Sequence, residues 1–191
     1  METKQPESIT LALAWLLVLM GLTAKADPLT AIPNHIVYPE GFASAGQPQP
    51  EHYADIAAAG FERIVYLAYA DQPEADVGND RAAHEAGLDF VQIPVRWDGP
   101  RHSDFASFAA LLNASEEKVY VHCQLNYRAS AFSFLYRVIY QNVPVASAKT
   151  ALDSIWRPNE TWLAFMRSTL ARHGFELDCD GCDWSQPPAR D

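Results

Sequence analysis

The chain has 191 residues, a length that fits one globular domain with additional segments. Its hydrophobic content of 49% is ample for a packed core. The formal net charge of −10 argues against nucleic acids and anionic membrane surfaces as partners, because both are polyanions. Any anionic ligand would therefore depend on positive charge gathered locally.

The N-terminus has the pattern of an export signal. Residues 9–22 form an apolar run that is shorter than the roughly 20 residues of a membrane span. The small-x-small sequence that ends at Ala26 is typical of a signal-peptidase site, so residues 1–26 are predicted to be removed. The alternative is an uncleaved anchor, because the first eight residues are not clearly basic. Removal predicts an exported protein, periplasmic in a Gram-negative source, with no stable membrane span.

Strands and helices alternate through the next part of the chain. Two short strands are expected at 35–38 and 42–45, followed by a helix at 51–59 that Gly60 ends. The β-branched and aromatic run at 61–69 predicts a buried strand. A helix ending before Gly87, a strand at 88–95, a helix that Ser103 caps and a strand at 118–123 follow.

The last third is helical. Helices are expected at 129–141 and 144–156, and Asn159 is expected to cap another that ends before Gly174. Strands separated by helices predict an α/β fold with a mostly parallel central sheet flanked by helices. The domain is predicted to span 27–174, and residues 175–191 form an acidic, proline-rich tail without a clear element.

The three cysteines fall into two groups. Cys179 and Cys182 form a C-x-x-C turn in the tail and can pair in an oxidising compartment. Cys123 is then the odd thiol, either reactive or buried. A redox role of the tail pair towards Cys123 is a further alternative, and a metal site lacks two more evident ligands.

Cys123 lies where a strand ends and a helix begins, and ligands bind at this edge of a parallel sheet. The helix N-terminus and the backbone N–H groups there can bind an anion and favour a thiolate. Arg128 can grip two oxygens of a phosphoryl group, Ser130 can donate a hydrogen bond to the sulfur, and His122 is expected to orient the loop. The predicted phosphate-binding positions are Gln124, Leu125, Asn126, Tyr127, Arg128, Ala129 and Ser130.

The segment HCQLNYRAS resembles the phosphate-binding loop of cysteine-dependent phosphatases of the dual-specificity and tyrosine type. The chain is most similar to their bacterial beta-lactamase-hydrolase-like branch. The segments SAGQPQPEHYADIAAAGFERIVYL, FVQIPVRWDGP and VYVHC match that branch in order, over residues 33–140. The resemblance implies a three-layer phosphatase architecture. It also implies phosphate-monoester hydrolysis by Cys123 through a phosphocysteine, without a metal or other cofactor.

The chain departs from the family pattern in its loop. The family has C-x5-R with a glycine at the third intervening position, whereas this chain has C-x4-R and Asn126 in place of that glycine. Asparagine tolerates a positive φ better than most residues. Ala129 stands where the family arginine is expected, so Arg128 comes one position early.

The family mechanism needs an aspartic acid that protonates the leaving oxygen and then activates water. Asp98 follows the IPV strand in the position of the family acid loop, 25 residues before Cys123. Asp104 is the alternative, although an acid in the first turn of a helix is also explained by the helix dipole. The third possibility is that neither Asp98 nor Asp104 is the general acid.

Two other functions stay open. A rhodanese-like sulfurtransferase would carry a persulfide on Cys123 and would need no aspartic acid, and its loop resembles C-x4-R in length. A catalytically silent module would keep an oxyanion-binding loop without turnover, a reading that the early arginine suggests. The sequence does not identify the substrate or the oligomeric state.

Overall fold

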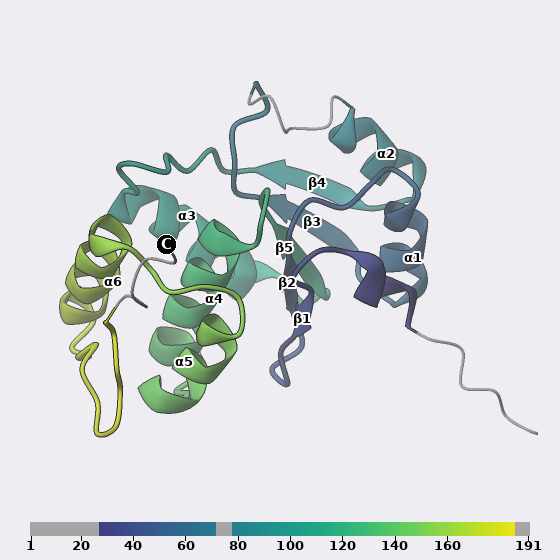
Figure 1. The fold of residues 1–191 in the computed structure, drawn as a ribbon. Helices are drawn as coiled ribbons and strands as arrows, with labels where there is room; N and C mark the ends of the chain where they lie inside the picture. The colour runs from purple at the N-terminus through teal and green to yellow at the C-terminus, as the bar shows by residue number, and fades with distance from the viewer. Residues whose placement is uncertain (1–26, 72–77, 186–191) are drawn as a thin grey trace, which may run out of the picture.

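The computed structural model describes residues 27–71 and 78–185, in which strands and helices alternate along the chain (Figure 1). A short 3-10 helix, η1, precedes the first strand. The helices and strands are η1 (Pro28–Ala31), β1 (Ile36–Val37), β2 (Ala43–Ala45), α1 (His52–Ala58), β3 (Arg63–Tyr66), α2 (Asn79–Glu85), β4 (Asp89–Gln92), α3 (His102–Ala114), β5 (Val119–His122), α4 (Tyr127–Tyr140), α5 (Val145–Asp153) and α6 (Glu160–Arg172).

The strands form one sheet in the order β1-β2-β5-β3-β4. Only the pairing of β1 with β2 is antiparallel within the described residues, and the other neighbours are parallel. The predicted mostly parallel sheet is therefore confirmed. β5 lies in the middle, with Val121 paired to Ser44 on one side and to Val65 on the other. The carboxyl ends of β2, β3 and β5 therefore meet at one edge.

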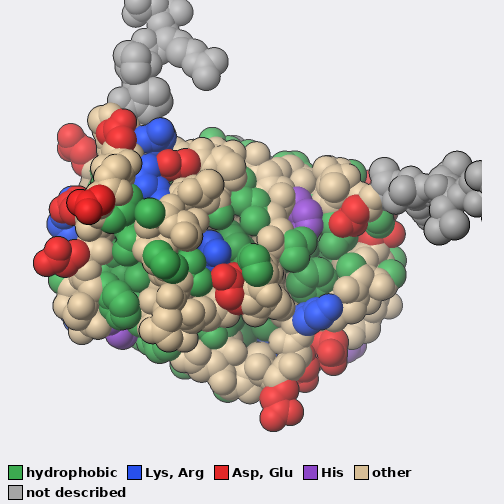
Figure 2. Space-filling view, turned by 90° about the horizontal axis from the view of Figure 1, so that it is seen from below, with side chains coloured by type: hydrophobic (Ala, Val, Ile, Leu, Met, Phe, Trp, Pro, Cys, Tyr) green, Lys and Arg blue, Asp and Glu red, His purple; other side chains and the backbone are tan. Residues whose placement is uncertain are grey.

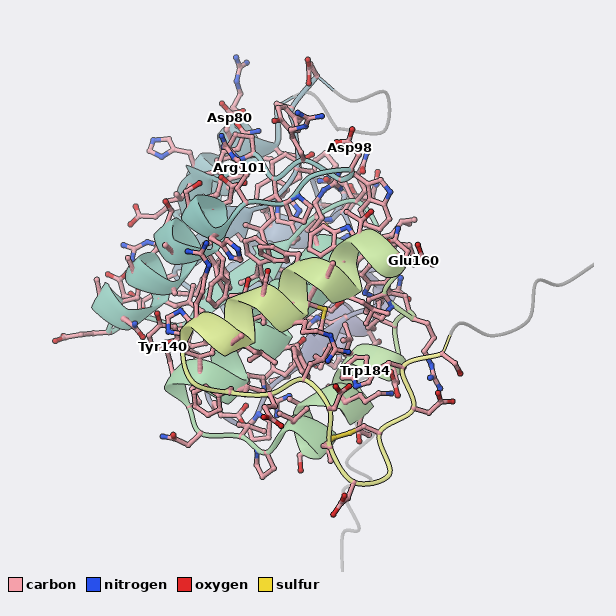
Figure 3. The ribbon with its side chains drawn as sticks, turned by 90° about the vertical axis from the view of Figure 1, so that its left-hand side faces the viewer. Asp80, Asp98, Arg101, Tyr140, Glu160 and Trp184 are labelled. Atoms are coloured by element: carbon pink, nitrogen blue, oxygen red, sulfur yellow. A yellow bond between two sulfur atoms is a disulfide. The ribbon has the colours of Figure 1, made fainter. Side chains whose placement is uncertain are left out.

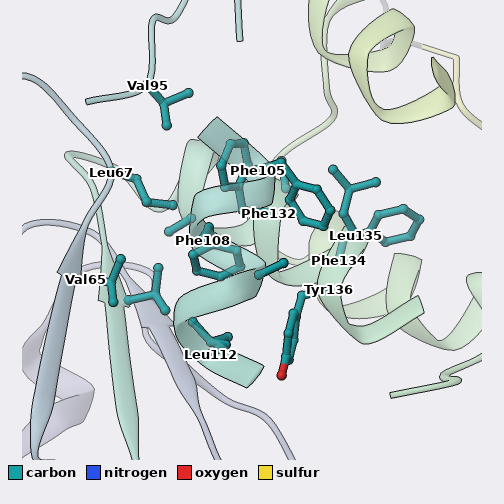
Figure 4. Packing of buried hydrophobic residues seen from close by; sticks show 14 of the residues in the cluster. Val65, Leu67, Val95, Phe105, Phe108, Leu112, Phe132, Phe134, Leu135 and Tyr136 are labelled. Carbon is teal, nitrogen blue, oxygen red and sulfur yellow. The ribbon is translucent and has the colours of Figure 1, made fainter. Parts of the chain in front are cut away.

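Helices cover both faces of the sheet, which confirms the three-layer α/β architecture. Figure 1 shows α1 and α2 on one face and α3, α4, α5 and α6 on the other. Each face has its own hydrophobic core. The larger core, on the side of α3 to α6, is rich in aromatic rings, several of which are drawn in Figure 4. Val121 and Cys123 belong to this core, whereas Tyr120 belongs to the other.

α4 is the central helix of the larger layer. It packs against α3, α5, α6 and strand β2, and its residues from Arg128 to Val138 are all buried. Its sequence is apolar almost all round, as expected for a helix enclosed by other elements. Because α4 is fixed on several sides, the residues in its first turn are held firmly beside the end of β5.

Two helix starts differ from the prediction by two residues, and both matter for the site. α3 begins at His102, and Asp104 caps it by accepting a hydrogen bond from the N–H of Arg101, so the predicted capping by Ser103 is wrong. α4 begins at Tyr127, two residues earlier than expected. This early start places Arg128 within the first helical turn. Asn159 caps α6 as predicted, through a hydrogen bond of 3.1 Å from the N–H of Trp162.

The described part of the tail has no helix or strand but is packed against the domain. Leu177 is buried, and the ring of Trp184 meets Phe134 edge-on and lies 4.7 Å from the Lys149 ammonium (Figure 3). Cys179 and Cys182 form a disulfide, which confirms their predicted pairing. The predicted signal segment lies outside the described residues. Within them, no helix has the length and apolar character needed to cross a membrane.

Candidate active site

Cys123 follows the last residue of the central strand β5, at the edge where parallel strands end. Its N–H donates a hydrogen bond of 3.3 Å to the carbonyl oxygen of Ala45 in β2, and its side chain is 1% exposed. The free thiol is therefore held on the sheet side of a pocket rather than displayed on the surface. We refer to residues 123–128, which connect β5 to the first turn of α4, as the cysteine loop.

Two carbonyl groups of the cysteine loop are held by donors from outside it. The N–H of Gln47 donates to the Gln124 oxygen at 2.9 Å, and the side-chain amide of Asn34 donates to the Leu125 oxygen at 3.0 Å. In a trans peptide the following N–H points opposite to the carbonyl. The N–H groups of Leu125 and Asn126 are therefore turned away from these donors, which is the orientation that an anion-binding loop requires.

Asn126 provides the turn from the loop into α4. Its φ is 66°, in the left-handed region, so asparagine does take over the conformation for which the family uses glycine. Its carbonyl accepts the N–H of Ser130 at 2.8 Å, which starts the helical hydrogen bonding. The expectation that asparagine accepts a positive φ at this turn therefore agrees with the backbone geometry.

Gly46 allows three segments to meet behind the loop. A Cβ atom at this position would lie 2.9 Å from the carbonyl oxygen of Gln124 and 3.0 Å from that of Pro33. Gly46 also forms a bridge with Leu125 across an antiparallel pair. The glycine of the GQP turn is thus required by close backbone approach.

Arg128 is a buried cation without an acidic partner. Its residue surface is 4% exposed, and no ion pair of this side chain occurs among residues 27–71 and 78–185. Its Nη1 donates to Gln124 Oε1 at 3.1 Å, and its guanidinium lies 5.5 Å from the ring centre of Trp97. Its Nε has no hydrogen-bond partner among the described residues. A buried charge normally requires a counter-charge, which an anion in the pocket would supply.

Cys123 and Arg128 open into the same cavity, of about 330 Å³. Trp97, Leu125 and Tyr127 form its apolar wall, and Gln124 completes the lining. Tyr127 stacks on Trp156 with ring centres 4.8 Å apart, and Trp97 lies 5.4 Å from the same Trp156 ring. These rings support one another, so the wall is preformed. Trp162 is fully buried and donates from Nε1 to the Trp97 carbonyl at 3.0 Å.

His122 does not line this cavity, and the predicted orientation of the loop by this residue does not depend on well-formed hydrogen bonds of its ring. Its ring is fully buried and stacks on Tyr66 at 4.8 Å. Neither ring nitrogen has a hydrogen-bond partner of good geometry among the described residues. Burial lowers the pKa of His122 to about 3, against an opposing effect of the Cys123 backbone. His122 is thus neutral near pH 7 and supports the loop by packing.

Three of the predicted phosphate-binding positions do not line the cavity with their side chains: Asn126, Ala129 and Ser130. The predicted hydrogen bond from Ser130 to the sulfur is not formed. The Ser130 hydroxyl instead donates to the Tyr127 carbonyl at 3.2 Å and accepts from Trp156 Nε1 at 3.1 Å. Its role in this conformation is to join α4 to the tryptophan that backs the pocket wall.

Neither aspartate faces the thiol. Asp98 lies at the edge of the molecule in Figure 3, with 72% of its side chain exposed and an ion pair of 3.0 Å to Arg96. The hydrogen bond from Arg96 lowers the pKa of Asp98, which opposes the protonated form that a general acid needs. Asp98 instead lines a second cavity, together with Arg96 and Trp97. Asp104 is buried in the first turn of α3, where its carboxylate accepts hydrogen bonds from Arg101. This arrangement supports a structural role for Asp104 at the helix start rather than a role as general acid.

Sequence reasoning missed the segment before β1. Asn34 contacts the cysteine loop across 91 positions of the chain, and no local pattern in the sequence signals such a pairing. It also did not identify Trp97 as a wall of the pocket. Its position directly before Asp98, in a segment expected at the binding edge of the sheet, was the available signal.

Comparison with known proteins agrees with this geometry. Residues 35–139 match the family described as beta-lactamase hydrolase-like protein, phosphatase-like domain. Beta-lactamase hydrolase-like proteins of two Xylella fastidiosa strains, Temecula1 and 9a5c, are each 30% identical over 103 residues. The match covers 52% of this chain but 24% of those proteins, so the chain spans about a quarter of their length.

Solved structures share the fold. The DUF442 protein of Shewanella putrefaciens CN-32 is 28% identical with a TM-score of 0.69, covering 76% of this chain and 96% of that one. Tk-PTP, at 13% identity, has a TM-score of 0.60 over 73% of this chain and 98% of its own. P. aeruginosa TpbA, at 18% identity, has a TM-score of 0.57 over 73% and 86%. With its sheet, its cysteine loop and the family match over most of the domain, the chain belongs to the phosphatase-like domain family of the beta-lactamase hydrolase-like proteins, within the cysteine-dependent phosphatase superfamily.

Proposed function

We propose that the protein is an exported, metal-independent phosphatase that hydrolyses a phosphate monoester through a phosphocysteine on Cys123. The observation that carries this proposal is the buried Arg128, which has no acidic partner among the described residues and opens into the same cavity as the thiol. A cavity with a nucleophile and an uncompensated cation fits an electrophile that carries negative charge.

In the first step the Cys123 thiolate attacks phosphorus. A sulfur–phosphorus bond forms, the ester phosphorus–oxygen bond breaks, and the alcohol leaves with a proton from a general acid. Arg128 and the inward N–H groups of the cysteine loop hold the non-bridging oxygens. Because they are already in place, they stabilise the transition state without reorganisation.

In the second step water attacks phosphorus and the sulfur–phosphorus bond breaks. Inorganic phosphate leaves and the thiolate is restored, while the base that assists takes a proton from the water. Asp98 stays our candidate for both proton transfers. To act, it must exchange its ion pair with Arg96 for a position on the pocket side of Trp97.

A sulfurtransferase is the second candidate, and the placement of Asp98 favours it. Asp98 is exposed and paired with Arg96, and a sulfur transfer needs no general acid. In that reaction Cys123 would attack the outer sulfur of thiosulfate, a persulfide would form and sulfite would leave. A nucleophile such as cyanide would then accept the outer sulfur and release the thiolate.

One set of assays separates these functions. The full chain and the Cys123→Ser variant are tested with an aryl phosphate and then with thiosulfate plus cyanide. Phosphate release that Cys123→Ser abolishes supports the phosphatase, and thiocyanate formation without phosphate release supports the sulfurtransferase. Turnover of neither substrate, with inorganic phosphate still bound, would instead identify a silent oxyanion-binding module.

Export and substrate class remain parts of the proposal. The disulfide between Cys179 and Cys182 fits an oxidising compartment, in line with the signal-like segment. The face of the described residues shown in Figure 2 carries acidic side chains mainly around its edge and isolated lysines and arginines. Such a surface does not favour a nucleic acid or an anionic membrane. A phosphorylated protein or small molecule is the expected partner.

A further inference from the structure

Asn34 and Asn126 form a reciprocal pair behind the cysteine loop. The side-chain amide of Asn126 donates to the Asn34 carbonyl at 2.7 Å, and the side-chain amide of Asn34 donates to the Leu125 carbonyl at 3.0 Å. Both asparagines have a positive φ, of 54° and 66°. Each therefore supplies a backbone conformation that few residues tolerate and a side-chain donor to the other segment.

The segment that carries Asn34 is itself anchored. Leu29 and Ile32 are buried in the smaller core, with 2% and 1% of their surfaces exposed. The carbonyl of Pro33 accepts the N–H of Gly46 at 2.7 Å. Asn34 thus projects from a fixed support, and its amide can impose a position on the loop rather than follow it.

We infer that Asn34 is a positioning residue of the anion site, and that residues 27–34 form part of the apparatus that shapes the cysteine loop. The inference rests on the proposed binding of an oxyanion at this loop. The Asn34 amide holds the Leu125 carbonyl outward, and the N–H of Asn126 consequently points to the opposite side. Without that donor the peptide can rotate, which would turn an oxygen rather than an N–H towards the anion and the thiolate.

The test uses glycine substitutions in the full chain, because glycine accepts a positive φ and removes only the side chain. Asn34→Gly and Asn126→Gly are made singly and together. Asn142→Gly is the matched control, since Asn142 also has a positive φ, of 55°, but lies beyond the opposite end of α4. Binding of inorganic phosphate is measured by calorimetry. The thiolate of Cys123 is followed by its ultraviolet absorbance against pH, relative to Cys123→Ser.

Each single variant is expected to bind phosphate about fivefold more weakly, since the loss corresponds to about one net hydrogen bond. The thiolate titration should move to higher pH in both, and Asn142→Gly should change neither measurement. The fold-loss in phosphate affinity of the double variant should be smaller than the product of the fold-losses of the two single variants, because the two asparagines act as one unit. A merely structural role would lower the unfolding temperature without moving the titration.

The inference is overturned if Asn34→Gly binds phosphate and titrates like the unchanged protein. It is also overturned if the control shows the same losses as the two site variants. Neither measurement needs turnover, so the test is independent of the proposed phosphatase activity. A protein that binds phosphate with the help of this pair but hydrolyses no phosphate ester would contradict the phosphatase proposal and still support this inference. Failure of the unchanged protein to bind phosphate would overturn the anion site and this inference with it.

Discussion

Replacement of Arg128 by methionine should abolish phosphate binding without weakening the ligand-free fold. Arg128 is 4% exposed and no acidic partner faces it among the described residues, so the folded protein bears the cost of a buried charge. Methionine has a similar length and no charge. The substitution should therefore abolish phosphate binding while it maintains or raises the stability of the ligand-free protein. Such a trade-off is expected where a binding site is kept at a cost in stability.

The expected change in the free energy of unfolding follows from the contacts of the Arg128 side chain. The variant loses one hydrogen bond to Gln124, a charged bond worth about 1.5–3 kcal/mol, and the Trp97 contact, worth about 0.5–2 kcal/mol. The variant also no longer buries an unpaired ion, a burial that costs several kcal/mol in the unchanged protein. The free energy of unfolding without ligand is therefore expected to stay unchanged or rise by about 1–2 kcal/mol.

Arg137→Met is the matched control on the same helix. Arg137 is also buried, but its Nε pairs with Glu40 at 3.0 Å, with side-chain exposures of 7% and 22%. Its guanidinium also lies 4.8 Å from the ring centre of Tyr38. Removing it leaves a partly buried carboxylate without its partner, so the free energy of unfolding should fall by about 2–4 kcal/mol.

Urea denaturation with and without inorganic phosphate measures both effects. At about 100 times its dissociation constant, phosphate should stabilise the unchanged protein and Arg137→Met by about 2.7 kcal/mol, and Arg128→Met not at all. The reasoning is refuted if Arg128→Met loses several kcal/mol without phosphate while phosphate fails to stabilise the unchanged protein. Arg128 would then be a structural cation rather than the binding group of an anion site.

Gly46→Ala should lower the free energy of unfolding by about 1–3 kcal/mol and weaken phosphate binding, because the added Cβ would lie 2.9 and 3.0 Å from two carbonyl oxygens. Unchanged phosphate binding, measured by calorimetry, would contradict this prediction. Asp98 has a pKa lowered by Arg96, so its contribution to stability is present above the unfolded pKa of 3.8 and lost as pH falls through the lower folded value. Urea titrations between about pH 5 and 2 should show this small loss in the unchanged protein and not in Arg96→Gln. Cys179→Ser with Cys182→Ser should cost about 2 kcal/mol of stability, as expected for a very short loop, and leave phosphate binding unchanged. Weaker phosphate binding in that variant would connect the tail to the site.

The parts of the site that sequence reasoning predicted correctly follow from local rules. A strand that ends at Cys123 and a helix that begins a few residues later place the thiol at the binding edge of a parallel sheet. Asn126 in a left-handed conformation follows from the tolerance of asparagine for positive φ. The pairing of Cys179 with Cys182 follows from their spacing. Each of these depends on residues close to one another in the chain.

The parts that were missed or wrong depend on which partner each polar group takes in the folded chain. The Ser130 hydroxyl accepts a hydrogen bond from Trp156 Nε1, 26 positions away, and donates to the Tyr127 carbonyl rather than to the sulfur. The Asp98 carboxylate pairs with Arg96, two positions before it, rather than lining the pocket of the thiol. Neither competition can be read from a pattern, because a hydrogen-bonding group chooses among all donors and acceptors that folding brings near it.

The sequence determined the α/β architecture, the order of its elements and the place of Cys123, since hydrophobic periodicity and turn residues act within short windows. Only the tertiary structure decided how an arginine one position early reaches the pocket. The start of α4 at Tyr127 puts Arg128 in the first turn, where Gln124 and the face of Trp97 hold its guanidinium at the cavity that Cys123 also lines. It also decided that no acid would neutralise that charge among the described residues, because burial depends on packing from every side.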